Sequence, residues 1–110
     1  MKIKALKIDA KLGCVIPVEI ESEDIIDEIQ RMIGADVFTN AGEFGNGRLH
    51  IELQDNALLK PIDRMFFAGF YPAPMVGDGL LAAWDEDIDV TAAELQAELS
   101  FVPTPDMEQN

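Results

Sequence analysis

Short runs in which apolar and polar residues alternate are the feature that most limits the fold of this chain. The clearest run covers residues 49–53, where leucine and isoleucine alternate with a histidine and a glutamate. Successive side chains of a β-strand point to opposite faces, so this period of two predicts a half-buried strand. Similar patterns over 3–8 and 15–20 predict two strands joined around 11–13. Pro17 has no N–H for a ladder, which favours an edge position for the second of these strands.

Two helix signals interrupt the strands. Ser22 offers an N-cap, and apolar residues then recur at helical spacing before Gly34. The stripe of this first helix is expected to consist of Ile25, Ile26, Ile29, Met32 and Ile33. Thr91 and Glu94 form a capping box, which predicts a second helix. Its buried stripe is expected to consist of Leu95 and Leu99.

The remaining segments complete the predicted order of elements. Further strands are expected over 36–39, 64–70 and 79–84, with a glycine-rich turn over 41–47 and an extended segment over 58–62. The order is therefore β-β-α-β-β-β-β-α. It predicts an α+β fold in which two helices pack on a mostly antiparallel sheet. A chain of 110 residues has room for one core, so residues 1–102 are interpreted as a single domain and 103–110 as a frayed tail.

Acidic residues dominate the charge. The formal net charge is −13, and after Arg64, the last basic residue, nine carboxylates follow before the end of the sequence. Four of the five lysines lie within the first eleven residues. Nucleic acids and anionic membranes are normally bound through Lys and Arg, so direct binding to either is disfavoured.

The apolar runs and the cysteine content indicate a cytoplasmic location. The longest apolar runs are only a few residues long, and the lysine-rich start lacks a continuous apolar segment followed by a cleavage site. Cys14 is the single cysteine and fits a reducing compartment. We expect it to be a half-buried strand residue.

Alternating carboxylates at Asp85, Asp87 and Asp89 suggest a calcium loop, because such residues can converge on a hard cation. The rest of the motif is absent: Val90 stands where the loop needs glycine, and Gln96 where it needs a bidentate glutamate. We therefore interpret the segment as a solvated turn whose charge lies before a helix N-terminus, and we predict no metal site.

The other candidates for chemistry are also weak. Gly42, Gly45 and Gly47 are spaced loosely like a phosphate-binding loop, but a strand follows them, so a flexible hairpin turn is the better interpretation. His50 and Glu52 are expected to form a surface pair on one face of a strand. No second acid or nucleophile is seen to join them. No catalytic residue and no cofactor is predicted.

A proline-stiffened apolar loop has the composition of an interface anchor. It contains Phe70, Tyr71 and Met75 around two prolines, and such a loop has little conformational entropy to lose on binding. The competing interpretation is that Phe70 and Met75 fold back into the core.

Asp85, Glu86, Asp87 and Asp89 form a second candidate surface for a partner. Their charge can steer a basic protein toward this surface. A more specific form of this hypothesis is that the carboxylates imitate the phosphates of a nucleic acid and occupy the nucleic-acid groove of another protein. Ordinary solubility is the competing explanation for this acidity.

Several short motifs resemble an uncharacterised family of small proteins encoded by phages, plasmids and integrated elements. They lie at residues 1–9, 30–34, 55–64, 76–79 and 87–91. Differences from the family are Asp63 in place of the usual asparagine, Ala57 in place of a turn glycine, and an added loop at 72–75. The resemblance implies a mobile-element origin and the cytoplasm of a bacterial host, and it supplies no activity.

Two hypotheses of different classes follow. The preferred one is a non-enzymatic acidic accessory protein that binds a host or phage protein with a basic surface, with inhibition of a nucleic-acid-handling or defence enzyme as one version. The alternative is a small metabolite- or metal-binding domain, or an enzyme of unknown reaction, that uses His50, Glu52 or the carboxylate-rich C-terminal region. A homodimer through an open sheet edge also remains open.

Overall fold

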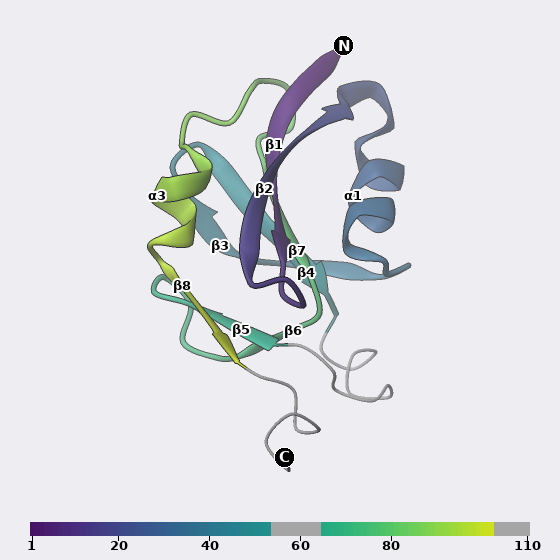
Figure 1. Cartoon of the computed structure of the whole chain (residues 1–110). Helices are drawn as coiled ribbons and strands as arrows, with labels where there is room; N and C mark the ends of the chain where they lie inside the picture. The colour runs from purple at the N-terminus through teal and green to yellow at the C-terminus, as the bar shows by residue number, and fades with distance from the viewer. Residues whose placement is uncertain (54–64, 103–110) are drawn as a thin grey trace.

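Two antiparallel sheets and two short helices make up the described part of the chain, residues 1–53 and 65–102 of the computed structural model (Figure 1). The elements are β1 (Lys2–Asp9), β2 (Cys14–Glu21), the 3-10 helix η1 (Ser22–Asp24), α1 (Ile25–Ile33), β3 (Phe38–Phe44), β4 (Gly47–Glu52), β5 (Met65–Ala68), β6 (Met75–Val76), β7 (Gly79–Ala82), α3 (Ala92–Gln96) and β8 (Leu99–Val102). The predicted α+β class with mainly antiparallel pairing is confirmed.

The larger sheet has five strands in the order β2-β1-β7-β4-β3. Its centre is β7, which pairs with β1 on one side and with β4 on the other, and every residue of β7 is buried. Gly79 is the first residue of this strand, and little space is available there for a side chain. A Cβ there would lie 3.1 Å from Leu49 Cδ1 and 3.2 Å from Phe66 Cζ, so the tight packing favours glycine.

Helix α1 covers one face of this sheet (Figure 1). Its buried residues Ile25, Ile29 and Ile33 recur at helical spacing and form the stripe that packs on the sheet. The side chains that meet this stripe are Ile3, Ala5, Ile20, Leu80 and Ala82. Gly34 ends the helix with φ of 70°, a left-handed conformation that glycine adopts without steric cost.

The second sheet and α3 form the core on the opposite face. This sheet has the order β6-β5-β8, and it contributes the buried residues Phe66 and Met75. Leu95 of α3 joins them. The five-stranded sheet supplies Leu6, Ile8, Leu49, Ile51 and Leu81 to this cluster. The pleat of β1 thus sends alternate residues into two separate cores.

The structure corrects two expectations for β3 and β4. Strand β4 was expected to be half-buried, but Leu49, His50 and Ile51 are all buried because both faces of the sheet are covered here. The expected turn over 41–47 is shorter than predicted, since β3 continues to Phe44 and only two residues separate it from β4. A shift of register between Asn40 and Glu43 absorbs the irregular part of this hairpin.

Both helices also differ from expectation at one end. Ser22 does not cap a helix: it lies in η1, and Asp24 precedes α1 without a side-chain cap. Ile26 is 52% exposed and is not part of the buried stripe.

The capping box of Thr91 and Glu94 is confirmed, but α3 ends at Gln96. Leu99 belongs instead to β8, which sequence analysis missed, and it pairs there with Ala68 of β5.

The predicted edge position of β2 is confirmed. Cys14 is half-buried at the start of this strand, also as expected.

The extended segment 58–62 and the tail 103–110 lie outside the described residues. Within 1–53 and 65–102, no helix is long and apolar enough to cross a membrane.

Candidate functional site

The acidic turn, residues 85–89, is bonded to two other parts of the molecule. Asp87 Oδ1 accepts the backbone N–H of Lys4 at 2.8 Å, and the N–H of Ile88 donates to the carbonyl of Lys4 at 3.0 Å. Asp89 and Asn46 bond reciprocally: the N–H of Asn46 donates to Asp89 Oδ1 at 3.1 Å, and the N–H of Asp89 donates to Asn46 Oδ1 at 2.8 Å. The turn is thereby fixed to β1 and to the β3–β4 hairpin.

These bonds divide the predicted acidic residues into two kinds. All four carboxylates are exposed, but Asp87 and Asp89 also hold the turn in place, so the segment is more than the solvated turn expected from sequence. Asp85 and Glu86 make no such bonds within 1–53 and 65–102. They are therefore the residues whose charge can be changed with least effect on the fold.

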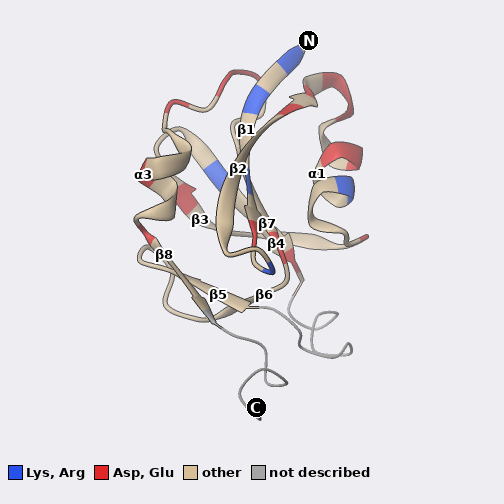
Figure 2. Cartoon of the chain, viewed as in Figure 1, with Lys and Arg blue, Asp and Glu red and all other residues tan. Residues whose placement is uncertain are grey.

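A second acidic segment lies at the same end of the molecule, beside the N-terminus (Figure 2). It includes Glu23 and Asp24, both exposed. Hydrogen bonds with Glu21 and with the Met1 ammonium lower the pKa of Glu23 to about 2. Glu23, Asp24, Asp85, Glu86 and Asp87 are referred to below as the acidic end. The Met1 ammonium, which pairs with Glu21 and Glu23, and the exposed Lys2 and Lys4 lie at the same end, so the five carboxylates exceed the cations there by two.

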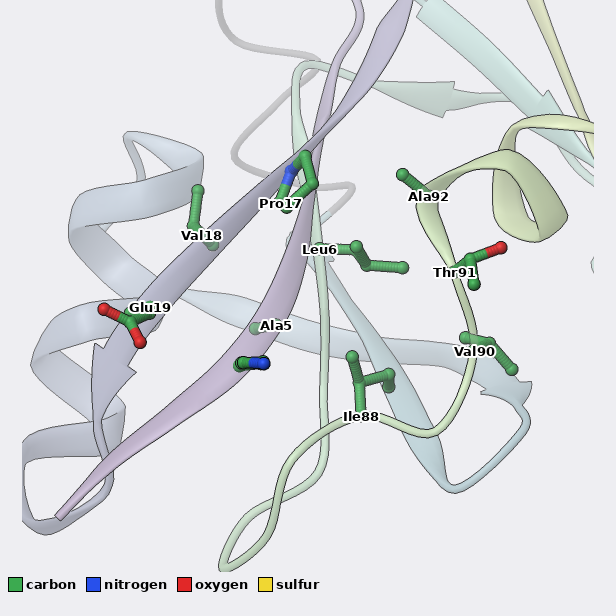
Figure 3. A pocket seen from close by; sticks show the side chains of 10 residues that line it. Ala5, Leu6, Pro17, Val18, Glu19, Ile88, Val90, Thr91 and Ala92 are labelled. Carbon is green, nitrogen blue, oxygen red and sulfur yellow. The ribbon is translucent and has the colours of Figure 1, made fainter.

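An open apolar groove of about 650 Å³ lies between the β1–β2 ladder and the segment that leads into α3. It is lined by residues 4–6, 17–19, 88 and 90–92, and this set is called the groove below. Figure 3 shows Leu6 of β1 and Ile88 of the opposite wall pointing into the space between them, with Pro17 and Ala92 at its sides. Leu6 stands opposite Pro17 in the strand register, so both lie on this face of the sheet.

Charged groups flank the groove. Lys4 and Glu19 are opposite each other in the β1–β2 register, and both are exposed. The carboxylate of Asp87 lies on the other side of Lys4, where it accepts that residue's backbone N–H. The groove thus combines an apolar floor with one lysine between two carboxylates.

Side chains occupy much of the outer edge of β2. The N–H of Val15 donates to Gln96 Oε1 at 3.1 Å, and the N–H of Glu21 donates to Glu28 Oε2 at 2.8 Å. Outward N–H groups recur at every second residue of an edge strand, so the backbone nitrogens of Pro17 and Glu19 point to the outer edge, as those of Val15 and Glu21 do. Pro17 has no N–H, which leaves Glu19 as the outward donor between these positions. Pairing of a second chain with β2 would have to displace the two side-chain bonds.

The apolar loop turns its aromatic and methionine side chains toward the molecule itself. Phe70 stacks on Phe44 with ring centroids 5.5 Å apart, Tyr71 is partly buried against the core, and Met75 is fully buried as the first residue of β6. The competing interpretation, that Phe70 and Met75 fold back into the core, is confirmed. We do not include this loop in the candidate site.

His50 is buried, and the expected surface pair with Glu52 was wrong. It is 3% exposed, and its ring contacts the edges of Phe38 at 5.6 Å and Trp84 at 6.1 Å between centroids. Its Nε2 has no hydrogen-bond partner among the described residues. Burial, with a smaller contribution from the charge of Arg48, lowers the pKa of His50 to about 4, so the imidazole is neutral at pH 7.

In residues 1–53 and 65–102, no group of three or more His, Cys, Asp or Glu side chains is arranged to hold a metal ion. Of the residues predicted to bind a partner, the structure places the acidic turn beside the groove, together with Lys4 and Glu19. Phe70, Tyr71 and Met75 do not line the groove. Sequence analysis missed the groove because its walls are far apart in the chain. Only the strand pairing of Leu6 with Pro17 could have indicated it.

Comparisons with protein-family models, with curated proteins and with solved structures found no match for this chain. The resemblance to phage- and plasmid-encoded proteins stays a prediction.

Proposed function

We propose that this chain is a non-enzymatic protein-binding module that engages a partner protein with a basic surface. The observation that carries this proposal is the acidic end, where two segments distant in sequence place exposed carboxylates at the same end of the molecule (Figure 2). The net charge of −13 extends this field beyond the contact itself. Such fields accelerate association with basic proteins and repel acidic ones.

The proposed partner belongs to the class of proteins that handle nucleic acids. These proteins neutralise phosphates with Lys and Arg, so they present basic surfaces that an acidic protein can occupy. A protein bound in this way competes with the nucleic acid, which is the basis of the proposed inhibition of a nucleic-acid-handling or defence enzyme of a bacterial host. The resemblance to mobile-element proteins motivates this version.

The test is capture of partners from a bacterial lysate by two variants with the same change of charge. The first removes three carboxylates of the acidic end, Asp24→Asn, Asp85→Asn and Glu86→Gln. The matched control removes three exposed carboxylates of other segments, Asp36→Asn, Glu43→Gln and Glu98→Gln. Both variants have a net charge of −10, because three of the thirteen excess negative charges are lost.

We expect the unchanged protein to retain a basic nucleic-acid-binding protein at about 50 mM salt and to release most of it at about 300 mM, since screening shortens the reach of the field. The acidic-end variant should lose about tenfold in affinity for that protein, and the control about twofold. Equal retention by both variants, or capture that does not respond to salt, would contradict the proposal.

A further inference from the structure

We infer that the groove receives apolar side chains from a basic segment of the partner protein. This inference rests on the proposed function, and it names the part of the partner that the acidic protein holds. The acidic end would attract the segment, and the groove would supply the apolar contact that fixes it in place.

The groove has the size and the lining of a recognition site. Its volume of about 650 Å³ lies within the range of about 300–1,000 Å³ typical of ligand pockets. Pro17 on one wall, and Ile88 and Ala92 on the other, offer apolar surface, and the buried Leu6 lies between them (Figure 3). Apolar anchors in such pockets contribute most of the affinity of many protein interfaces, while the charged surroundings contribute orientation.

Both walls of the groove are constrained by a proline or by hydrogen bonds, and such constraints lower the entropy cost of binding. On one side, Pro17 fixes the backbone of β2 opposite Leu6. On the other side, the capping box of Thr91 and Glu94 fixes the start of α3, and the bond from Asp87 to Lys4 fixes the approach to it. A preformed groove of this kind does not have to become ordered when a partner enters.

The charges around the groove identify the occupant. A second copy of this chain would carry another −13, and mutual repulsion disfavours it. An acidic segment would meet Glu19 on one side and Asp87 on the other. A segment with Lys or Arg next to its apolar residues places those cations beside these two carboxylates, and among the residues that line the groove the cation that opposes it is Lys4. The outer edge of β2 is largely closed, so contact through side chains in the groove is favoured over strand addition.

Three synthetic peptides of equal length separate the apolar contribution from the charge. They alternate leucine with lysine, serine with lysine, and leucine with glutamate. We expect saturable binding of the leucine–lysine peptide, with changes in the amide resonances of Leu6, Val90 and Ala92. The serine–lysine peptide should bind at least about tenfold more weakly, because it lacks the apolar contact. Binding of the leucine–glutamate peptide with equal affinity, or resonance changes confined to other segments, would overturn the inference.

Ala92→Lys and Ala93→Lys form the matched pair of variants. Both residues lie in the first turn of α3, but Ala92 lines the groove and Ala93 is exposed outside it. Ala92→Lys should weaken binding of the leucine–lysine peptide about tenfold or more, and Ala93→Lys less than about twofold. If Ala92→Lys does not fold, Glu19→Lys in the groove and Glu43→Lys on β3 provide the same comparison. Equal effects within the pair that folds would overturn the inference.

The two proposals fail in different ways. If capture of the partner depends on the acidic end while Ala92→Lys captures it normally and still binds the leucine–lysine peptide, the groove is not the contact site and only this inference fails. If the peptide fills the groove while capture ignores the acidic end, the proposed function fails, and with it the assignment of the groove to a basic protein partner.

Discussion

Gln96 Oε1 accepts the backbone N–H of Val15 at 3.1 Å, so that a side chain of α3 occupies a donor on the outer edge of the five-stranded sheet. Glu28 of α1 does the same for Glu21 near the other end of that strand. Pro17, between them, has no donor to offer. Exposed strand edges invite pairing with other chains, and these three features together reduce that risk.

Opening this edge should therefore promote self-association. We expect the triple variant Pro17→Val, Glu28→Ala and Gln96→Ala to show a rise in apparent mass with concentration in sedimentation experiments. Gln96→Ala alone should cost about 1 kcal/mol of stability, the usual net contribution of one hydrogen bond. Gln30→Ala is the control, because Gln30 also bonds a backbone group, the carbonyl of Asp36, away from this edge. A triple variant that stays monomeric at all concentrations would contradict the prediction.

The buried imidazole of His50 should make the protein less stable in mild acid. Its pKa is about 4 in the folded chain and about 6.5 when unfolded, so the unfolded state binds more protons between these values. The free energy of unfolding should thus fall as the pH drops from about 6.5 to about 4, by at most about 3 kcal/mol from this residue.

His50→Leu removes this titration and the unpartnered Nε2 together. We expect the difference in unfolding free energy between variant and parent to grow in favour of the variant over the same pH window, as measured by urea denaturation. The carboxylates are present in both chains, and their effects cancel in this difference. A difference that is independent of pH would show that His50 is not held neutral by the fold.

The reciprocal bonds between Asn46 and Asp89 should behave as a coupled unit. Either Asn46→Ala or Asp89→Ala is expected to cost about 0.5–1.5 kcal/mol, the usual net contribution of a hydrogen bond, because both bonds are exposed and water can replace the lost partner. In a double-mutant cycle the second substitution should cost less than the first, with a coupling of at least about 0.5 kcal/mol. Asp85→Ala is the control and should change stability by less than about 0.5 kcal/mol. Strict additivity would contradict the coupling.

Gly47 controls one wall of the groove. A Cβ at this position would lie 2.1 Å from Ile88 Cδ1 and 3.0 Å from Leu81 Cγ, so Gly47→Ala has to displace the Ile88 side chain. We expect a cost of about 1–3 kcal/mol and weaker binding of the leucine–lysine peptide. Adding Ile88→Val removes the Cδ1 atom and should restore part of the stability. Loss of stability without any such rescue would indicate that the contact with Leu81 dominates.

The sequence predicted those features that depend on neighbours along one strand or helix. Alternation located β1, β2 and β4, and the Thr91 to Glu94 spacing located the start of α3. The same alternation failed for His50, because it shows that His50 faces away from Leu49 without showing whether that second face is covered. Here Phe38 and Trp84 cover it.

The pairing of Leu6 with Pro17 could have indicated one wall of the groove, but the other wall could not be predicted because it depends on contacts between distant residues. The bond from Lys4 to Asp87 joins positions separated by 83 residues, and no local pattern encodes it. Strand β8 was missed for a similar reason: Leu99 fits the helical stripe of Leu95 until β5 is available to pair with it. Tertiary pairing overrides local propensity in such segments.

The central place of β7 has a consequence for the order in which the protein is made. The β1–β2 and β3–β4 hairpins can each form as soon as they leave the ribosome, because their partners are adjacent in the chain. In the five-stranded sheet β7 is the strand that pairs with both hairpins, and it is synthesised later. We therefore expect nascent chains that end before Gly79 to expose two unjoined halves to chaperones, and assembly to begin only once that strand has emerged.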